Sequence, residues 1–116
     1  MNGANVKNQR RYERVKIGKH ADVFAVDEKG KRLGAICVLG QGGLMISTSA
    51  PYQVGDRHKI TVIDEVEEIS RELSLVVRSV EDGKVGFSFE TLDRDAAVEI
   101  GIIIGKYYES EDLEEE

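Results

Sequence analysis

Residues 71–90, "RELSLVVRSVEDGKVGFSFE", contain the clearest strand pattern in the chain. Large apolar side chains recur there at every second position, at Leu73, Leu75, Val77, Val85, Phe87 and Phe89. Because successive side chains of a β-strand point to opposite faces, this spacing predicts two strands that each bury one face. Between them, the segment EDGK at 81–84 supplies a turn, with Gly83 available for positive φ. The stretch therefore predicts an antiparallel hairpin of strands 71–80 and 85–90.

Four further short stretches have the composition of strands and are separated by turn residues. They are residues 20–26, 32–39, 44–47 and 58–63. Gly30 lies in the turn after the first of them, and the one proline, Pro51, lies in the loop 50–57. Together with the hairpin this makes six short antiparallel strands at close spacing, which is typical of a small barrel or sandwich.

The hydrophobic period changes after residue 90. Apolar residues now recur at intervals of three and four, at Ala96, Ile100, Ile103, Ile104, Tyr107 and Tyr108. This is the spacing of an amphipathic helix, and Asp93 is suited to its N-cap. We therefore predict one helix over 93–108 that packs on the strands. The complete prediction is a mainly β fold, a six-stranded antiparallel β-barrel with a C-terminal α-helix.

Gly101 and Gly105 form a GxxxG pair within the predicted helix. In a lipid-facing helix this spacing favours dimerisation, because small residues let two helices approach closely. In a helix that packs on a barrel, the same spacing favours close contact between the helix backbone and a strand. We expect the second arrangement.

Length and charge divide the chain into three parts. Its 116 residues are enough for one domain with one core. We predict a flexible N-terminal arm over 1–9, a single domain over 10–108 and a disordered acidic tail over 109–116. Six basic residues and one acid give residues 1–20 a charge of +5, although the whole chain carries −6. A basic arm on an acidic protein indicates a local anion site and argues against a general nucleic-acid surface.

The sequence lacks the patterns of membrane segments and of enzymes. No apolar run approaches the ~20 residues that span a bilayer, and no signal peptide is evident, so we expect no membrane insertion. Cys37 is the one cysteine, which fits a reducing cytoplasmic location. His20 and His58 have no neighbouring metal-ligand pattern, and there is no phosphate-binding loop with its lysine. We therefore expect no enzyme, no catalytic or metal site and no cofactor.

The basic arm contains the pattern R-x-x-x-R, with Arg10 and Arg14 four residues apart and Arg11 between them. In a loop, two guanidinium groups at this spacing can surround one anion. Arginine suits phosphate because its planar donors bind two oxygens at once, and it also stacks on flat bases. We expect residues 7–16 to lie loosely in the free protein and to become ordered when an anion binds.

The order of these features resembles the PilZ family, whose bacterial members sense the second messenger cyclic di-GMP. An R-x-x-x-R arm precedes the first strand, and a glycine turn in "CVLGQGGLMIS" (37–47) follows the second. The core then ends in "KVGFSFE" (84–90) and a helix closes the chain. The resemblance covers residues 9–108. It implies that Arg10 and Arg14 hold the phosphates and stack on guanine.

The second motif of that family, [D/N]-x-S-x-x-G, grips a guanine edge, and this chain keeps only part of it. Gly43 matches the final glycine, and Gly42 matches the glycine that commonly precedes it. Val38 stands where the Asp or Asn belongs, and Gly40 stands where the Ser belongs. We expect Gly42 and Gly43 to form a tight turn between strands, and a positive φ at Gly40 would resist any side chain.

Two functions are consistent with this pattern. In the first, the protein binds cyclic di-GMP and acts through an unidentified protein effector. The ligand would then contact Arg10, Arg11, Arg14, Gly40, Gln41, Gly42 and Gly43. In the second, the domain has lost the ligand and works as a protein–protein adaptor. The retained arginines favour the first function and the missing Asp and Ser favour the second. A nucleic-acid partner is not expected, because the chain lacks an array of exposed aromatics or a basic groove.

Overall fold

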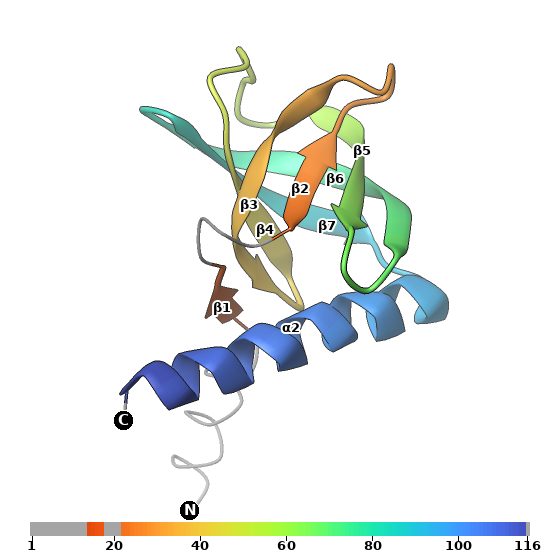
Figure 1. Ribbon diagram of the computed structural model, residues 1–116. Helices are drawn as coiled ribbons and strands as arrows, with labels where there is room; N and C mark the ends of the chain where they lie inside the picture. Colours follow the sequence, from red (N-terminus) through yellow and green to blue (C-terminus); the bar gives the residue numbers. More distant parts are fainter. Residues whose placement is uncertain (1–13, 18–21, 116) are drawn as a thin grey trace, which may run out of the picture.

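The computed structural model describes residues 14–17 and 22–115 of the chain (Figure 1). Seven strands and one long helix follow one another in the sequence. They are β1 (Arg14–Lys16), β2 (Val23–Val26), β3 (Arg32–Gly40), β4 (Gly43–Ser47), β5 (Arg57–Asp64), β6 (Ile69–Glu81), β7 (Lys84–Thr91) and α2 (Arg94–Glu115). The predicted hairpin 71–90 is the pair β6–β7, with a turn at Asp82 and Gly83.

The sheet closes on itself. Its strand order is β1-β3-β2-β5-β6-β7-β4, and β3 also pairs with β4, so six strands from β2 to β7 form a closed barrel. All of these pairings are antiparallel. The predicted fold, a six-stranded antiparallel barrel with a C-terminal helix, is therefore confirmed. Closure also removes most free strand edges, on which other chains could pair.

The seventh strand, β1, was not predicted and corrects our expectation of a loose arm up to residue 16. Arg14–Lys16 pairs with the end of β3, and Arg14 lies opposite Gly40. Val15 and Ile17 are buried, with 2% and 6% of their surface exposed, and the Ile17 N–H donates to the Cys37 carbonyl at 2.9 Å. Burial of these two apolar residues holds the segment on the barrel, although its other residues are basic. Residues 1–13, including the predicted arm 1–9, lie outside the described residues.

The barrel interior is filled by the alternate apolar residues that the sequence pattern identified. The fully buried members include Ile36, Leu39, Ile46, Ile60, Val62, Leu75, Val77 and Val85. Helix α2 lies across one open end of the barrel and contacts β1 most extensively (Figure 1). It buries Ala96, Ile100, Ile103 and Ile104 there, so one apolar face of the helix completes the core. Asp93 is its N-cap, as predicted, because its Oδ1 accepts the Ala96 N–H at 2.8 Å.

Helix α2 is longer than the sequence pattern indicated. We predicted an end at Tyr108 and a disordered tail over 109–116, but the helical backbone continues to Glu115. No glycine or proline follows Gly105 to stop it, and glutamate and leucine are good helix formers. In Figure 1 this C-terminal part of α2 projects past the barrel. Within the described residues, no helix combines the length and apolar character that a membrane crossing needs.

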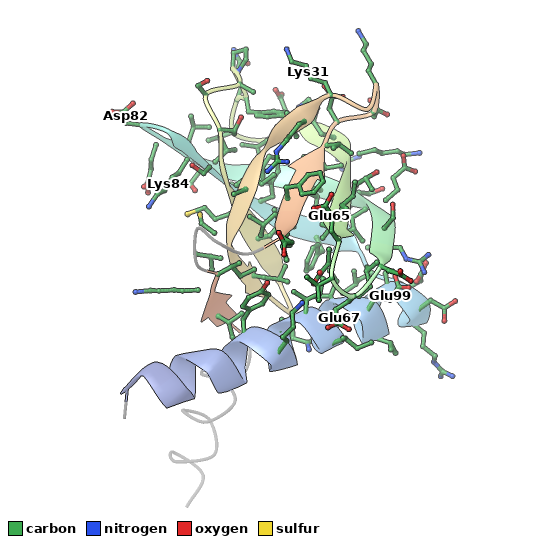
Figure 2. The ribbon with its side chains drawn as sticks, in the orientation of Figure 1. Lys31, Glu65, Glu67, Asp82, Lys84 and Glu99 are labelled. Carbon is green, nitrogen blue, oxygen red and sulfur yellow. The ribbon has the colours of Figure 1, made fainter. Side chains whose placement is uncertain are left out.

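A buried carboxylate fastens α2 to the barrel. Asp64, at the end of β5, is fully buried, and Lys106 of α2 donates to its Oδ2 at 2.8 Å. Its Oδ1 accepts the backbone N–H groups of Val66 and Glu67 at 3.0 and 3.1 Å. Figure 2 shows Glu67 beside α2, and its carboxylate lies 3.6 Å from Lys106 Nζ. Every polar atom of this buried charge is thus engaged, as a buried ion requires.

Candidate functional site

A pocket of about 370 Å³ lies on the outer surface of the barrel, where the β3–β4 turn meets strands β6 and β7. Its lining is Val38, Gly40, Gly42, Gly43, Leu44, Met45, Arg78, Gly86 and Phe87. Four glycines, from three strands and the β3–β4 turn, therefore meet in one place. The structure brings together three of the predicted site residues, Gly40, Gly42 and Gly43, and adds Arg78 from β6.

Strand register explains why this surface faces outward. Leu39 of β3 and Leu44 of β4 are paired and point into the core, with 0% and 4% exposed. Their neighbours therefore point to the opposite face. On that face Met45 lies between Val38 of β3 and Gly86 of β7. The result is a flat floor of glycine backbone with apolar side chains beside it.

Close approach of a neighbouring strand, rather than a left-handed conformation, explains Gly43 at this turn. Among the described residues, positive φ at glycine occurs only at Gly30, Gly34, Gly55 and Gly83. Gly40 is not among them, so the positive φ that would resist a side chain there is absent. A Cβ on Gly43 would lie 2.0 Å from the Phe87 carbonyl oxygen, whereas one on Gly42 would meet no described atom within 4 Å. Of these two glycines, Gly43 is thus the one that a neighbouring strand requires.

Arg78 is the pocket residue that sequence reasoning missed. Its Nε donates to the Ser88 hydroxyl at 2.8 Å. No bond from its terminal Nη atoms to another described residue is found. The side chain is exposed and borders the pocket, so those donors are available to a ligand. The sequence signal was only its outward place in the β6 alternation. That position indicates a pocket residue only when the strand order, in which β6 lies two strands from β4 and the glycine turn, is known.

The other predicted site residues are placed only in part. Arg10 and Arg11 lie outside the described residues. The backbone of Arg14 belongs to β1 and is paired with Gly40, which brings this end of the arm to the glycine turn. Gln41 is exposed at the tip of the β3–β4 turn and is not part of the pocket lining.

His58 and Tyr52 lie together in a cluster of rings, and neither residue lines the pocket. His58 begins the β5 region, as predicted, and its ring packs edge-on against Tyr52 at 4.6 Å between centroids. Tyr52 in turn packs on Phe87, and its burial, with a further contribution from Asp27, raises the pKa of its hydroxyl. His20 lies outside the described residues. In residues 14–17 and 22–115 no group of three or more metal-ligating side chains is found.

Comparison with known proteins decides the family. The profile of the PilZ domain matches residues 8–104 of the chain. The chain belongs to the PilZ domain family. This is a family of cyclic di-GMP receptor domains, which are binding and adaptor modules rather than enzymes. Among the curated proteins, none matches the chain.

Solved structures share this PilZ fold at low sequence identity. Escherichia coli YcgR, solved in complex with c-di-GMP, has a TM-score of 0.68 and 18% identity over 88% of this chain and 46% of its own. The PilZ domain of CeSA from a cellulose-synthesizing bacterium has a TM-score of 0.60 and 13% identity, over 80% of this chain and 95% of its own. The Bacillus subtilis inhibitor of motility MotI/DgrA has a TM-score of 0.59 and 17% identity, over 80% and 49%. The chain thus spans about half the length of YcgR and MotI.

Proposed function

We propose that this PilZ domain binds cyclic di-GMP in the pocket over Gly40, Gly42 and Gly43 and transmits the binding to a protein partner. The observation that carries the proposal is the β1–β3 register, which fixes Arg14 opposite Gly40. This register supports the proposal because it puts the backbone of Arg14, the last residue of the R-x-x-x-R pattern, beside the glycine turn.

The chemistry of the pocket suits a flat, anionic ligand. Glycine backbone gives a floor on which a purine ring can lie close to the main chain, and Val38 and Met45 offer apolar contact beside it. The arginines of the arm suit the phosphates, because guanidinium donors bind two oxygens in parallel. Arg78 adds a cation to the lining of the pocket.

Arg78 offers a replacement for the lost base contacts at Val38 and Gly40. Its terminal nitrogens can donate together to O6 and N7 of guanine, which is the commonest way in which arginine reads that base. Adenine presents a donor in place of O6, so the same contact would disfavour it. The bond to Ser88 holds the guanidinium and leaves the terminal donors for the ligand.

Calorimetric titration with cyclic di-GMP tests the proposal. The missing Asp-type contact contributes about 1–3 kcal/mol and the missing Ser-type contact about 1 kcal/mol. Their loss therefore costs about 2–4 kcal/mol and weakens binding roughly 30- to 1,000-fold relative to a complete motif. We expect dissociation constants of tens of micromolar or weaker, which rise with salt and are abolished by Arg10→Ala or Arg14→Ala. Retained affinity in both arginine variants would contradict the proposal.

Restoring the second motif should restore affinity. We expect Val38→Asp combined with Gly40→Ser to strengthen cyclic di-GMP binding at least tenfold in the same titration. Gly40 lacks positive φ, so its backbone conformation accepts a serine. An unchanged circular dichroism spectrum would show that the double variant folds. If this folded variant binds cyclic di-GMP no more tightly than the unaltered protein, the turn does not have the geometry of the family's second motif.

Arg78→Ala should weaken cyclic di-GMP binding about tenfold and reduce the preference for cyclic di-GMP over cyclic di-AMP. The matched control is Arg57→Ala, because Arg57 is an exposed arginine of β5 that pairs with Glu90 and is absent from the pocket lining. We expect the control to change affinity less than twofold. Equal losses in the two variants would reduce the role of Arg78 to general charge.

The second candidate function is a cyclic di-GMP-independent PilZ adaptor that works by protein–protein interaction. The observation that favours it is the apolar Val38 and bare Gly40 at the two base-reading positions. Absence of binding by the unaltered protein and also by the Val38→Asp, Gly40→Ser variant would support the adaptor function.

A further inference from the structure

Helix α2 carries two apolar faces, and the barrel accounts for only one of them. Ala96, Ile100 and Ile103 are buried against the barrel. At about 100° per residue, the opposite face presents Val98, Gly101, Ile102 and Gly105. Val98 and Ile102 have 57% and 47% of their surface exposed, and both are among the few large apolar residues that the described surface leaves open. A helix that packs against a single partner has one apolar face, so a second apolar face indicates a second partner. We call the second face, formed by Val98, Gly101, Ile102 and Gly105, the stripe.

The two glycines of this stripe do not pack on a strand, contrary to our expectation. A Cβ added to Gly101 or Gly105 would meet no described atom within 4 Å. Each glycine is therefore a shallow gap beside an exposed β-branched side chain. Glycine also weakens a helix by about 1 kcal/mol relative to alanine, so packing within the described part of the domain gives no reason for either gap.

We propose that the second copy of this chain fills these gaps and that α2 pairs antiparallel with α2 of that copy. In a two-fold antiparallel pair centred between Gly101 and Ile102, each Val98 lies opposite Gly105 of the second copy. The two-fold axis brings like flanks of the two helices together, so the two Ile102 side chains contact each other beside this central pair. Each Val98 then fills a glycine gap, which is the self-complementarity that a two-fold interface requires.

Charge favours the same arrangement. The C-terminal residues 109–115 of α2 include five acids and no base, whereas the start of the helix holds one base, Arg94, between Asp93 and Asp95. The two-fold axis that matches the glycines also places position 109 beside Arg94 of the second copy. The N-terminal end of a helix carries partial positive charge, so it attracts the acidic end of its antiparallel neighbour. A parallel pair would instead bring two acidic ends together, which is unfavourable.

The barrels do not obstruct this pairing. The stripe of Val98, Gly101, Ile102 and Gly105 lies on the side of α2 opposite to the barrel-facing residues, and α2 crosses one end of the barrel (Figure 1). Two copies can therefore meet through their helices with one barrel on each outer side. The interface does not overlap the pocket of the proposed function, because none of the four stripe residues lines it.

Light scattering and sedimentation over about 10–500 μM test the association. The mass of the chain, 12.9 kDa, should rise towards twice that value with concentration. We expect Ile102→Glu to raise the concentration at which half of the chains are dimeric at least tenfold. Its matched control is Val54→Glu, which adds the same charge at a residue that is 64% exposed in the loop before β5. A constant monomer mass in the wild type, or equal shifts in both variants, would overturn the proposal.

Gly105→Leu separates association from folding. Because a Cβ at position 105 meets no described atom and leucine is a better helix former than glycine, the variant should melt at an unchanged or higher temperature. It should nevertheless associate at least tenfold more weakly, since the gap for Val98 of the second copy is filled. Unchanged association would show that the stripe is covered otherwise, for example by residues 1–13 of the same chain.

Cysteine cross-linking tests the register. In a Cys37→Ser background, a chain with Val98→Cys is mixed with a chain with Gly105→Cys and oxidised. The antiparallel pair predicts disulfide-linked dimers in the mixture and few in either chain alone, because equal positions lie about 10 Å apart along the helices. Efficient cross-linking of the Val98→Cys chain alone would overturn the antiparallel register.

Discussion

Gly43→Ala is expected to destabilise the protein by about 2–3 kcal/mol or more, although it adds a single methyl group. The added Cβ would lie 2.0 Å from the Phe87 carbonyl oxygen and 2.9 Å from the Ser88 Cα, and both atoms belong to the backbone of β7. Backbone cannot rotate away as a side chain can, so the β4–β7 pairing must shift. For a domain of this size we expect the melting temperature to fall by roughly 10–20 °C in a calorimetric scan.

Gly42→Ala is the matched control for this change. The neighbouring glycine has open space among the described atoms, and its φ is not positive. A methyl group there should leave stability within about 0.5 kcal/mol, or raise it slightly by restricting the unfolded chain. Similar losses of stability in the two variants would contradict the conclusion that strand β7 approaches Gly43 closely and does not approach Gly42.

Asp64→Ala is expected to cost about 3–5 kcal/mol, since it leaves the ammonium of Lys106 without its main partner. The substitution also removes the acceptor of the Val66 and Glu67 N–H groups. Urea denaturation measures the loss. Glu67→Gln is the control, because Glu67 lies 3.6 Å from Lys106 and is partly exposed, and exposed pairs contribute at most about 1 kcal/mol. Equal costs would show that Asp64 contributes no more than a surface charge.

The pH dependence of this pair has a defined sign. Burial lowers the pKa of Lys106, but its hydrogen bond to Asp64 and the nearby charges outweigh burial, and the pKa is raised overall. A lysine whose pKa is raised by folding stabilises the protein fully at pH values below the pKa of that lysine in the unfolded chain. The contribution is lost as the pH rises through the pKa of the lysine in the folded protein. The difference between wild type and Asp64→Ala should therefore persist at neutral pH and shrink above the ordinary lysine pKa of 10.5.

Strands β6 and β7 were predictable because they alternate apolar and polar residues, and the other barrel strands because of their composition and the turn residues between them. Strand β1 was missed because the charges of its neighbours concealed Val15 and Ile17, the two residues that hold it on the barrel. The end of α2 was missed because the apolar period stops at Tyr108, whereas helix propensity continues to Glu115. An apolar period reports which part of a helix is buried rather than where the helix ends.

The candidate site was predictable only where one segment of sequence contains it. The glycine turn was found from its spacing, but the reason for Gly43 lies in β7, far away in the chain. Arg78 could not be predicted as a pocket residue for the same reason. Its proximity to Gly43 follows from the pairing of β4 with β7 and of β7 with β6. Long-range strand pairing, which no local pattern encodes, therefore decides which residues share the pocket.

The β4–β7 pairing has a consequence for the order of folding. It joins residues 43–47 to residues 84–88, the most distant segments that any two strands of the barrel bring together. Pairings between distant segments must overcome a larger loop-closure entropy than hairpins. The β4–β7 pairing, which is the seam that closes this side of the barrel, is therefore expected to form late and to limit the rate of folding. The pocket straddles the seam, with Gly43 and Met45 on one side and Gly86 and Phe87 on the other. A chain that is still folding would therefore have no pocket, and the capacity to bind a ligand would emerge only in the final step of refolding.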